Sequence, residues 1–437
     1  MPAARFTRDA ARGTHRGMAG NNVTTSASER LLPLDIMRGL AVLGIFSVNI
    51  VGMAMIEEAY FYPPAFGFGM VADRVMWALN FILVDGKLRA LFSILFGASV
   101  VLVCERAVAA GRQPWRVHYP RMAVLLCFGL LHFYLLLWGD ILANYALVGS
   151  IAFFCWRLSA ERLLVMAIIA LALHNAPAVA YAEQLRVAQV MEAPNAPADD
   201  RNRIARWRAS LIPQPADLAA AKAAHRSVAA HARYMLREDP YRPLQSVIGY
   251  GVESLGLMLL GMAAYRSGFL TGRWTRRRYL QVGLACAGAS LLYFGMAAAA
   301  ILRAGFDPFT YMPLAQYWAG PMRPIGAIGY AALVILLVPV GGAVARRLAA
   351  AGRMAFSNYL GATLLGVLLF NGFGLQLYGT LSRAEVWLFV PPVWALMLWW
   401  SSWWLARFRH GPLEWVWRSL ARWRFEPLRQ AERASDG

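Results

Sequence analysis

One histidine and one aspartate have the residue types and the spacing that proton-transfer chemistry needs. In the segment GLLHFYLLLWGDILANYALVG, His132 precedes Asp140 by eight residues. On a helix this spacing places His132 about 12 Å from Asp140 along the axis and nearly on the same face. A histidine that a carboxylate orients can act as a general base or carry a proton. The segment therefore indicates either a catalytic pair or a polar pair that locks two helices together.

Three more charges stand close together in the apolar segment VDGKLRALFSILFGAS. Asp85 and Arg89 are four residues apart, so on one helix they are expected to neutralise each other. Lys87 points away from both and needs another partner, for which Asp140 is the candidate. Only two of the 43 basic residues are lysines, which favours a role for the compact, titratable ammonium of Lys87.

The elements that carry these residues are expected to be membrane-spanning helices. The chain has 437 residues, of which 59% are hydrophobic and 15% charged, whereas a soluble domain has about 25% charged residues. Several apolar runs are long enough to cross a hydrocarbon core of about 30 Å, and they do not alternate as barrel strands do. The expected fold is all-α, a polytopic integral membrane protein with about ten transmembrane helices. The predicted spans are 34–56, 86–104, 122–138, 141–157, 163–181, 246–265, 279–302, 324–345, 354–372 and 385–406.

The distribution of arginine predicts the orientation of these spans. The loops on one side hold 4, 2, 5 and 3 arginines, and they are 105–121, 157–162, 266–278 and 346–353. The alternate short loops hold 0, 2 and 1, and they are 57–73, 303–323 and 373–384. Because cytoplasmic loops are enriched in positive charge, both termini are expected in the cytoplasm. The net charge of +19 is thus divided among loop clusters, which argues against nucleic acid as a partner.

Five regions are expected along the chain. They are a disordered basic cytoplasmic tail over 1–33, an N-terminal transmembrane bundle with the candidate site over 34–181, a large extracytoplasmic loop over 182–245, a C-terminal transmembrane bundle over 246–406, and an interfacial helix with a cytoplasmic tail over 407–437. The large loop begins as a linker and continues as one surface helix. Met18 is an alternative start to Met1. The four cysteines lie in apolar runs without metal-ligand spacing, so no metal site and no bound cofactor are expected.

The first predicted span, in LDIMRGLAVLGIFSVNI, contains two further candidate residues. Asp35 can pair with Arg38 three residues later, which leaves Arg38 either structural or free to meet an anionic ligand at the cytoplasmic face. Asn49 lies about 16 Å deeper, where an amide is often a helix-packing hydrogen bond. Depth alone brings Asn49, Lys87 and the pair of His132 and Asp140 into the outer half of the membrane.

At these motifs the chain resembles the YeiB-like family of bacterial inner-membrane proteins, which carry a domain of unknown function. The matching segments are LDIMRGLAVLGIFSVNI, DGKLRALFSILFG, GLLHFYLLLWGDILANYALVG, GRMAFSNYL and GPLEWVWRSL. They extend from residue 34 to about residue 420. The resemblance implies a multi-pass protein of the bacterial cytoplasmic membrane, in a family that has often been described as transporters.

The first span is also similar to that of the transmembrane acyltransferase superfamily, which includes heparan-α-glucosaminide N-acetyltransferase and bacterial sugar O-acyltransferases. The resemblance implies transfer of an acyl group from cytosolic acyl-CoA to a glycan across the membrane. The superfamily pattern of Arg, ten residues, then His or Asn matches Arg38 and Asn49. The sugar O-acyltransferases have His at the second position, and the lysosomal enzyme has a His eleven residues later, where this chain has Tyr60. His132 would therefore have to supply the base.

Three functional hypotheses remain open. In a membrane acyltransferase, Arg38 and Arg121 would hold the phosphates of acyl-CoA as a co-substrate. Asn49 would bind the acyl carbonyl. The pair of His132 and Asp140 would deprotonate a glycan or a lipid-linked acceptor.

In the same hypothesis Lys87 and Asp85 would contact the substrate and set the charge of its pocket. A transporter or flippase for a small anionic or lipid-linked metabolite would instead use Lys87, His132 and Asp140 as a proton-coupled site. A non-catalytic membrane scaffold would use the same residues only for folding. In each case the lipid bilayer is a partner, and the sequence leaves the acceptor, the acyl donor and the oligomeric state open.

Overall fold

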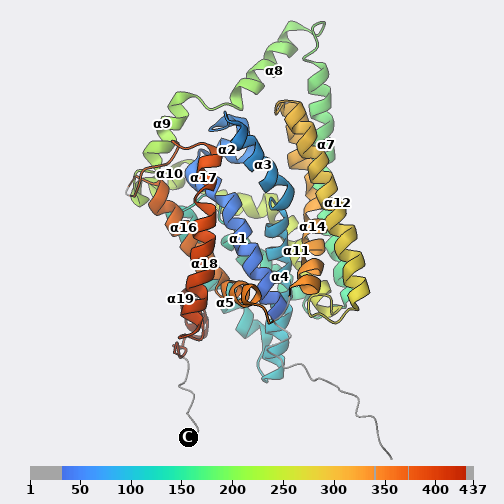
Figure 1. The fold of residues 1–437 in the computed structure, drawn as a ribbon, viewed down its shortest axis with the longest axis vertical. Coiled ribbons are helices and arrows are strands. Elements are labelled where there is room, and N and C mark those ends of the chain that lie inside the picture. Colours follow the sequence, from blue (N-terminus) through green and yellow to red (C-terminus); the bar gives the residue numbers. More distant parts are fainter. Residues whose placement is uncertain (1–31, 339–340, 373, 430–437) are drawn as a thin grey trace, which may run out of the picture.

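The computed structural model describes residues 32–338, 341–372 and 374–429, and it is all-helical (Figure 1). In the first half of the chain the helices are α1 (Leu32–Ala54), α2 (Glu57–Phe61), η2 (Pro63–Ala65), α3 (Val71–Leu83), α4 (Lys87–Ala109), α5 (Pro114–Leu135), α6 (Leu142–Ala152), η3 (Phe153–Cys155), α7 (Ala160–Val190), α8 (Ala198–Ser210) and α9 (Pro215–Ala224). In the second half they are α10 (Val228–Glu238), α11 (Arg242–Arg266), α12 (Arg276–Arg303), α13 (Pro308–Tyr311), η4 (Met312–Tyr317), α14 (Ala319–Leu337), α15 (Ala343–Arg353), α16 (Ala355–Phe370), α17 (Arg383–Trp387), α18 (Val390–Leu405) and α19 (Pro412–Arg422). The described residues form no strand, and one isolated bridge joins Phe408 to Arg429.

Among the described residues, six helical segments are long and apolar enough to cross a membrane. They are α1, the combined α3 and α4, α7, α11, α12 and α14. A bent pair, α15 and α16, would add a seventh, with 80° between the two helices. Each of the ten predicted spans overlaps a helix, but α16 and α18 have 16 residues each and α6 has 11. A straight crossing needs about 20 residues. These three helices are therefore too short to count as candidate spans.

A tight turn separates α3 from α4 and places two of the predicted site residues, Asp85 and Lys87. Gly86 has a φ of 70° and comes directly before Lys87, the first residue of α4. A Cβ at Gly86 would lie 2.3 Å from the side chain of Arg323, so only glycine fits there. The turn leaves Asp85 outside the helix, although the sequence predicted that Asp85 and Arg89 share one.

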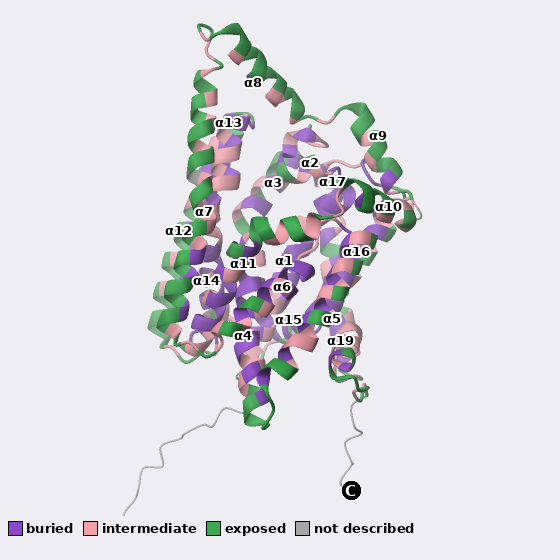
Figure 2. Ribbon diagram, turned by 180° about the vertical axis from the view of Figure 1, so that it is seen from behind, coloured by how far each residue is buried: buried purple, intermediate pink, exposed green. Residues whose placement is uncertain are grey.

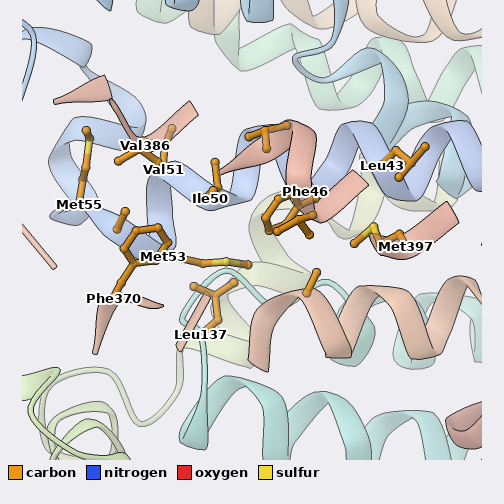
Figure 3. Close-up of a cluster of buried hydrophobic side chains, with 14 of the residues drawn as sticks. Leu43, Phe46, Ile50, Val51, Met53, Met55, Leu137, Phe370, Val386 and Met397 are labelled. Carbon is orange, nitrogen blue, oxygen red and sulfur yellow. The ribbon is translucent and has the colours of Figure 1, made fainter. Parts of the chain in front are cut away.

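The core of the bundle forms around α1, which packs against α4, α15, α16, α17 and α18. Figure 3 shows apolar side chains of α1 meeting those of the C-terminal helices, and its labelled residues are Leu43, Phe46, Ile50, Val51, Met53, Met55, Leu137, Phe370, Val386 and Met397. A second close contact joins α4 to α11. A Cβ on Gly97 would lie 1.9 Å from the Met258 carbonyl oxygen, and one on Gly261 would lie 1.8 Å from that of Ile94. Glycine therefore lets these two backbones touch.

The outer helices present apolar surface. Exposed faces run along α7 and α12 (Figure 2). On α7 the exposed apolar side chains include Leu164, Val165, Ile168, Ile169 and Leu173. These faces suit contact with lipid because their side chains are apolar, and a helix in a bilayer satisfies its own backbone hydrogen bonds.

The region predicted as the large loop, 182–245, is more helical than expected. Helix α7 continues to Val190 and α8 begins at Ala198, so of the predicted linker MEAPNAPADDRNR only residues 191–197 lie between helices. The predicted surface helix is two helices, α9 and α10, and the Ser227 hydroxyl accepts a hydrogen bond from Ala230 N at the start of α10. Figure 1 shows this region at the end of the molecule opposite α19.

Helix α19 lies within residues 407–437, the region in which the sequence predicts a helix. It begins at Pro412, after Gly411. The Glu414 carboxylate accepts hydrogen bonds from Phe356 N at 2.8 Å and Ser357 N at 3.0 Å, which caps the start of α16. The beginning of α1 lies at the same end of the molecule (Figure 1). The predicted tail over 1–33 and the choice between Met1 and Met18 fall almost wholly outside the described residues.

Candidate functional site

A hydrogen-bonded chain of three side chains is centred on His132. Its Nδ1 lies 2.8 Å from Asp140 Oδ1, and its Nε2 lies 3.0 Å from Thr363 Oγ1 on α16. His132 is in the last turn of α5, and Asp140 is in the turn before α6, where its Oδ2 accepts from Ala143 N at 2.8 Å. The His132 and Asp140 side chains are 1% and 2% exposed. The predicted pair is present, because the chain reverses after α5 and returns the carboxylate to the ring.

A cavity of about 290 Å³, which we call the Asp140 cavity, lies on one side of this pair. Its polar and charged lining is Asn80, Asp85, Arg89, Asp140, Asn144, Arg242, Ser246, Gln316, Arg323 and Arg383. Its aromatic lining is Tyr60, Phe61, Trp77, Phe81, Phe133, Trp138, Tyr145, Tyr250 and Tyr311. Charged and aromatic groups at one site can bind a polar molecule that also presents flat apolar faces.

A second cavity of about 300 Å³, which we call the Arg38 cavity, opens toward the end of the bundle that carries α19. Its charged lining is Arg38, Arg121, Arg353, Glu414 and Arg418. Arg38 donates to Asp35 Oδ1 at 2.8 Å and to the Ser99 hydroxyl. The guanidinium of Arg121 lies 5.0 Å from the Trp417 ring centroid. The sequence predicted Arg38 and Arg121 on a shared ligand, and both line this cavity.

The two cavities meet at the His132 pair. Ile141 and Tyr145 line both of them. Asp140 lines the Asp140 cavity, whereas Tyr359, whose ring centroid is 5.2 Å from that of His132, lines the Arg38 cavity. Asp140 therefore borders one cavity, and His132, which lines neither, lies in the partition between them. Each cavity is lined by four arginines.

Lys87 does not form the predicted ion pair with Asp140. Its Nζ donates to the carbonyl oxygens of Phe81 at 2.9 Å and Asp85 at 3.3 Å. It also lies 3.3 Å from the centroid of the Phe294 ring, a cation–π contact with α12. The side chain is fully buried and lines neither cavity. As the first residue of α4, Lys87 turns back toward α3 and α12 rather than toward α5.

The predicted pairing of Asp85 with Arg89 is also wrong. Arg89 donates to both carboxylate oxygens of Glu253 on α11, at 2.8 and 2.9 Å. Glu253 is a functional or structural residue that the sequence reasoning missed. An acid inside the apolar run GVESLGLMLLGM was the signal, because a buried intramembrane charge needs a partner.

Asn49 lies apart from the histidine. It faces a cavity of about 40 Å³ that also contacts Asp85, Arg89 and Ile141, and it has no hydrogen bond to His132 or Asp140. Depth in the membrane therefore did not bring all four predicted residues together. The role of Asn49 at an acyl carbonyl stays a prediction.

Another buried histidine, His231, lies outside the predicted spans and was not singled out from the sequence. His231 on α10 is 1% exposed, and its ring centroid is 5.3 Å from that of His225. Burial, reinforced by the nearby His225, lowers the pKa of His231 to about 4. The described residues contain no group of three or more histidine, cysteine or acidic side chains that could hold a metal ion.

The fold and the cavities define an all-helical membrane protein with about six candidate spans and a buried histidine–carboxylate pair. Comparison with known proteins then gives the family. The chain is 32% identical over 398 residues to the "Uncharacterized protein YeiB" of Escherichia coli, covering 90% of this chain and 96% of that protein. It is 27% identical to the "Uncharacterized protein YxaH" of Bacillus subtilis, with 92% and 97% covered. The chain belongs to the YeiB-like family.

Two other comparisons agree with this assignment. The family model described as "Protein of unknown function (DUF418)" matches residues 264–424. The chain is also 24% identical to the "Uncharacterized 39.9 kDa protein in amylase 3'region" of Bacillus acidopullulyticus, over 90% of this chain and 94% of that protein. No solved structure matches the chain.

Proposed function

We propose that the protein is a membrane acyltransferase that moves an acyl group from cytosolic acyl-CoA to an extracytoplasmic acceptor, which is a glycan or a lipid-linked molecule. One observation carries the proposal. The hydrogen-bonded pair of His132 and Asp140 lies in the partition between the arginine-lined Arg38 cavity and the Asp140 cavity. A reaction that joins a donor on one side to an acceptor on the other needs its base at such a partition.

We infer that the chain crosses the bacterial inner membrane ten times, with both termini in the cytoplasm. Four further crossings, by α5, by α6 with η3, by α16 and by α18, would add to the six candidate spans. The beginning of α1 lies at the same end as α19 (Figure 1), as an even number of crossings requires. In this orientation the arginine-rich loops and the Arg38 cavity face the cytoplasm.

The Arg38 cavity would receive the nucleotide part of acyl-CoA. Three arginines here, Arg121, Arg353 and Arg418, have no carboxylate within 4.0 Å among the described residues. The Arg418 Nε is buried and has no hydrogen-bond partner there. Guanidinium groups bind phosphate through paired hydrogen bonds, so a polyphosphate ligand would satisfy these donors.

The chemistry follows from the two ring nitrogens of His132. With Nδ1–H donating to Asp140, Nε2 has the lone pair that can accept a proton. The acceptor oxygen or nitrogen forms a bond to the acyl carbonyl carbon, and the carbon–sulfur bond of the thioester breaks. The acceptor proton passes to Nε2 and from there to the sulfur of CoA. The Thr363 hydroxyl occupies the Nε2 position in the structure, and an acceptor hydroxyl would replace it on binding.

The test uses purified protein reconstituted in liposomes made from a bacterial lipid extract. Acetyl-CoA labelled in the acetyl group is supplied, and both labelled product and released CoA are measured. Wild-type protein is expected to transfer label, and Asp140→Asn, which alters the tautomer that the carboxylate holds, is expected to lose most of the rate. Transport of the label into the lumen without CoA release would instead support a transporter.

A further inference from the structure

The Asp140 cavity contains charges that the protein does not neutralise. Four arginines line it, and two are paired: Arg89 with Glu253, and Arg242 with Glu57 and Asp239. The other two are Arg323 on α14 and Arg383 at the start of α17, and no carboxylate of the described residues lies within 4.0 Å of either guanidinium.

Arg383 is held in place by hydrogen bonds, but not all of its side-chain donors are used. It is 6% exposed, its backbone N donates to Gly67 O at 2.9 Å, and its Nη2 donates to Ala59 O. Its Nε is buried and has no hydrogen-bond partner among the described residues. A buried charged donor without a partner is costly, so this arrangement favours a ligand that supplies one.

Arg323 also has a hydrogen-bond donor without a partner among the described residues. Its stem lies against Gly86, where a Cβ would come within 2.3 Å of it. Its Nη2 donates only to Ala315 O at 3.2 Å, and its Nε is buried without a partner among the described residues. The turn between α3 and α4 thus requires glycine in order to make room for this guanidinium at the cavity wall.

Asp85 lies in the same cavity but does not neutralise these arginines. Its carboxylate forms no ion pair within 4.0 Å with any described residue. Asp85 and the two arginines thus line one cavity without contacting each other, which leaves space for a molecule that binds both kinds of charge. Such a molecule presents oxygens to the arginines and hydroxyl groups to Asp85.

We propose that Arg323 and Arg383 form a phosphate-binding subsite in the Asp140 cavity, so that the acceptor is a phosphate ester with neighbouring hydroxyl groups. Two separate guanidinium forks suit phosphate better than carboxylate, because one fork already satisfies both carboxylate oxygens. The phosphate belongs either to a lipid headgroup or to a soluble phosphorylated sugar or polyol. The identity of the ligand as the acceptor rests on the proposed function, whereas the subsite does not.

The test measures binding to the full-length protein in a phosphate-free non-ionic detergent by titration calorimetry. The probes are glycerol 1-phosphate, dihexanoyl-phosphatidylglycerol below its micelle concentration, and glycerol as the uncharged control. Saturable binding of at least one phosphate probe is expected, and the probe that binds identifies the source. Glycerol is expected not to bind.

Matched variants locate the site. Arg323→Gln and Arg383→Gln are each expected to weaken phosphate binding by about tenfold or more, the loss of a charge-assisted contact. Arg303→Gln, on an exposed arginine at the end of α12, is expected to bind as wild type. Arg418→Gln separates this subsite from the Arg38 cavity and is also expected to leave binding unchanged.

Three results would overturn the proposal. They are no saturable binding of either phosphate probe, wild-type binding in Arg323→Gln and Arg383→Gln, or a loss confined to Arg418→Gln. If Arg383→Gln is not monodisperse, Arg323→Gln and Arg323→Lys decide, because Arg323 is only half-buried. Phosphate binding without acyl transfer would refute the proposed function alone, and acyl transfer without phosphate binding would refute the subsite alone.

Discussion

Removing the charge of Glu253 tests the most unexpected contact in the bundle. Glu253→Gln keeps the size of the side chain but leaves Arg89 without its anionic partner. The Glu253 side chain is 6% exposed and that of Arg89 is 29% exposed. Breaking a buried ion pair from one side costs about 3–5 kcal/mol, and the partial exposure of Arg89 places the expected loss near the lower limit, at about 3 kcal/mol.

Asp85→Asn is the matched control for this change. Asp85 is the partner that helical spacing predicts for Arg89, but it forms no ion pair in the structure. Its substitution is expected to cost less than about 1 kcal/mol, as for a partly exposed unpaired charge. The double variant with Arg89→Gln and Glu253→Gln should recover part of the loss, because it leaves no charge unpaired.

The assay is unfolding in mixed micelles, followed by circular dichroism as the fraction of dodecyl sulfate rises. The apparent free energy of unfolding is compared among wild type, Glu253→Gln, Asp85→Asn and the double variant. If Asp85→Asn destabilised the protein as much as Glu253→Gln does, the helical pairing would be correct. If Glu253→Gln matched wild type, the contact between α4 and α11 would not hold the bundle together.

Three further predictions use the same protein preparation. Gly261→Ala forces a methyl group against the backbone of α4 and is expected to cost about 1–3 kcal/mol of stability. Gly295→Ala is the control: nothing lies within 4 Å of its Cβ, and it should stabilise α12 by about 0.5–1 kcal/mol. Equal effects of the two variants on the unfolding midpoint would contradict the close approach of α4 and α11. The pKa of His231 is 6.5 in the unfolded chain and about 4 in the folded protein, so between these values the unfolded chain binds more protons. The free energy of unfolding should therefore fall as the pH drops from 6.5 to 4. His231→Phe should lessen that fall. Thr363→Val should keep acyl transfer within about tenfold of wild type, because its hydroxyl only occupies the Nε2 position of His132, and a loss of about a thousandfold would show that it takes part in the reaction.

Contacts between neighbours in the sequence could be predicted, because helical geometry fixes them. The pair of Asp35 and Arg38 follows from a spacing of three residues. The beginning of α19 follows from Gly411 and Pro412. The all-helical class and the contact of His132 with Asp140 were also predicted, although the carboxylate is in a turn and not on the helix of the histidine.

Contacts between distant segments could not be predicted, because they depend on how the helices pack. Arg89 meets Glu253 across 164 positions of the sequence. Lys87 has backbone carbonyls and an aromatic ring as partners, which no charge pattern reveals. The sequence singled out Lys87 within an apolar run, and the turn at Gly86 decided where its side chain points.

The proposed acyl transfer is tested most directly by comparing wild type with His132→Gln. Both are supplied with labelled acetyl-CoA in liposomes of bacterial lipid extract, and released CoA and labelled product are measured. Wild type should release CoA and form labelled product, and His132→Gln should be slower by about 10²–10⁴-fold, as for loss of a general base. His174→Gln, on a half-buried histidine that lines neither cavity, should stay near the wild-type rate. A His132→Gln variant as fast as wild type, or a wild-type protein that neither releases CoA nor forms product, would contradict the account.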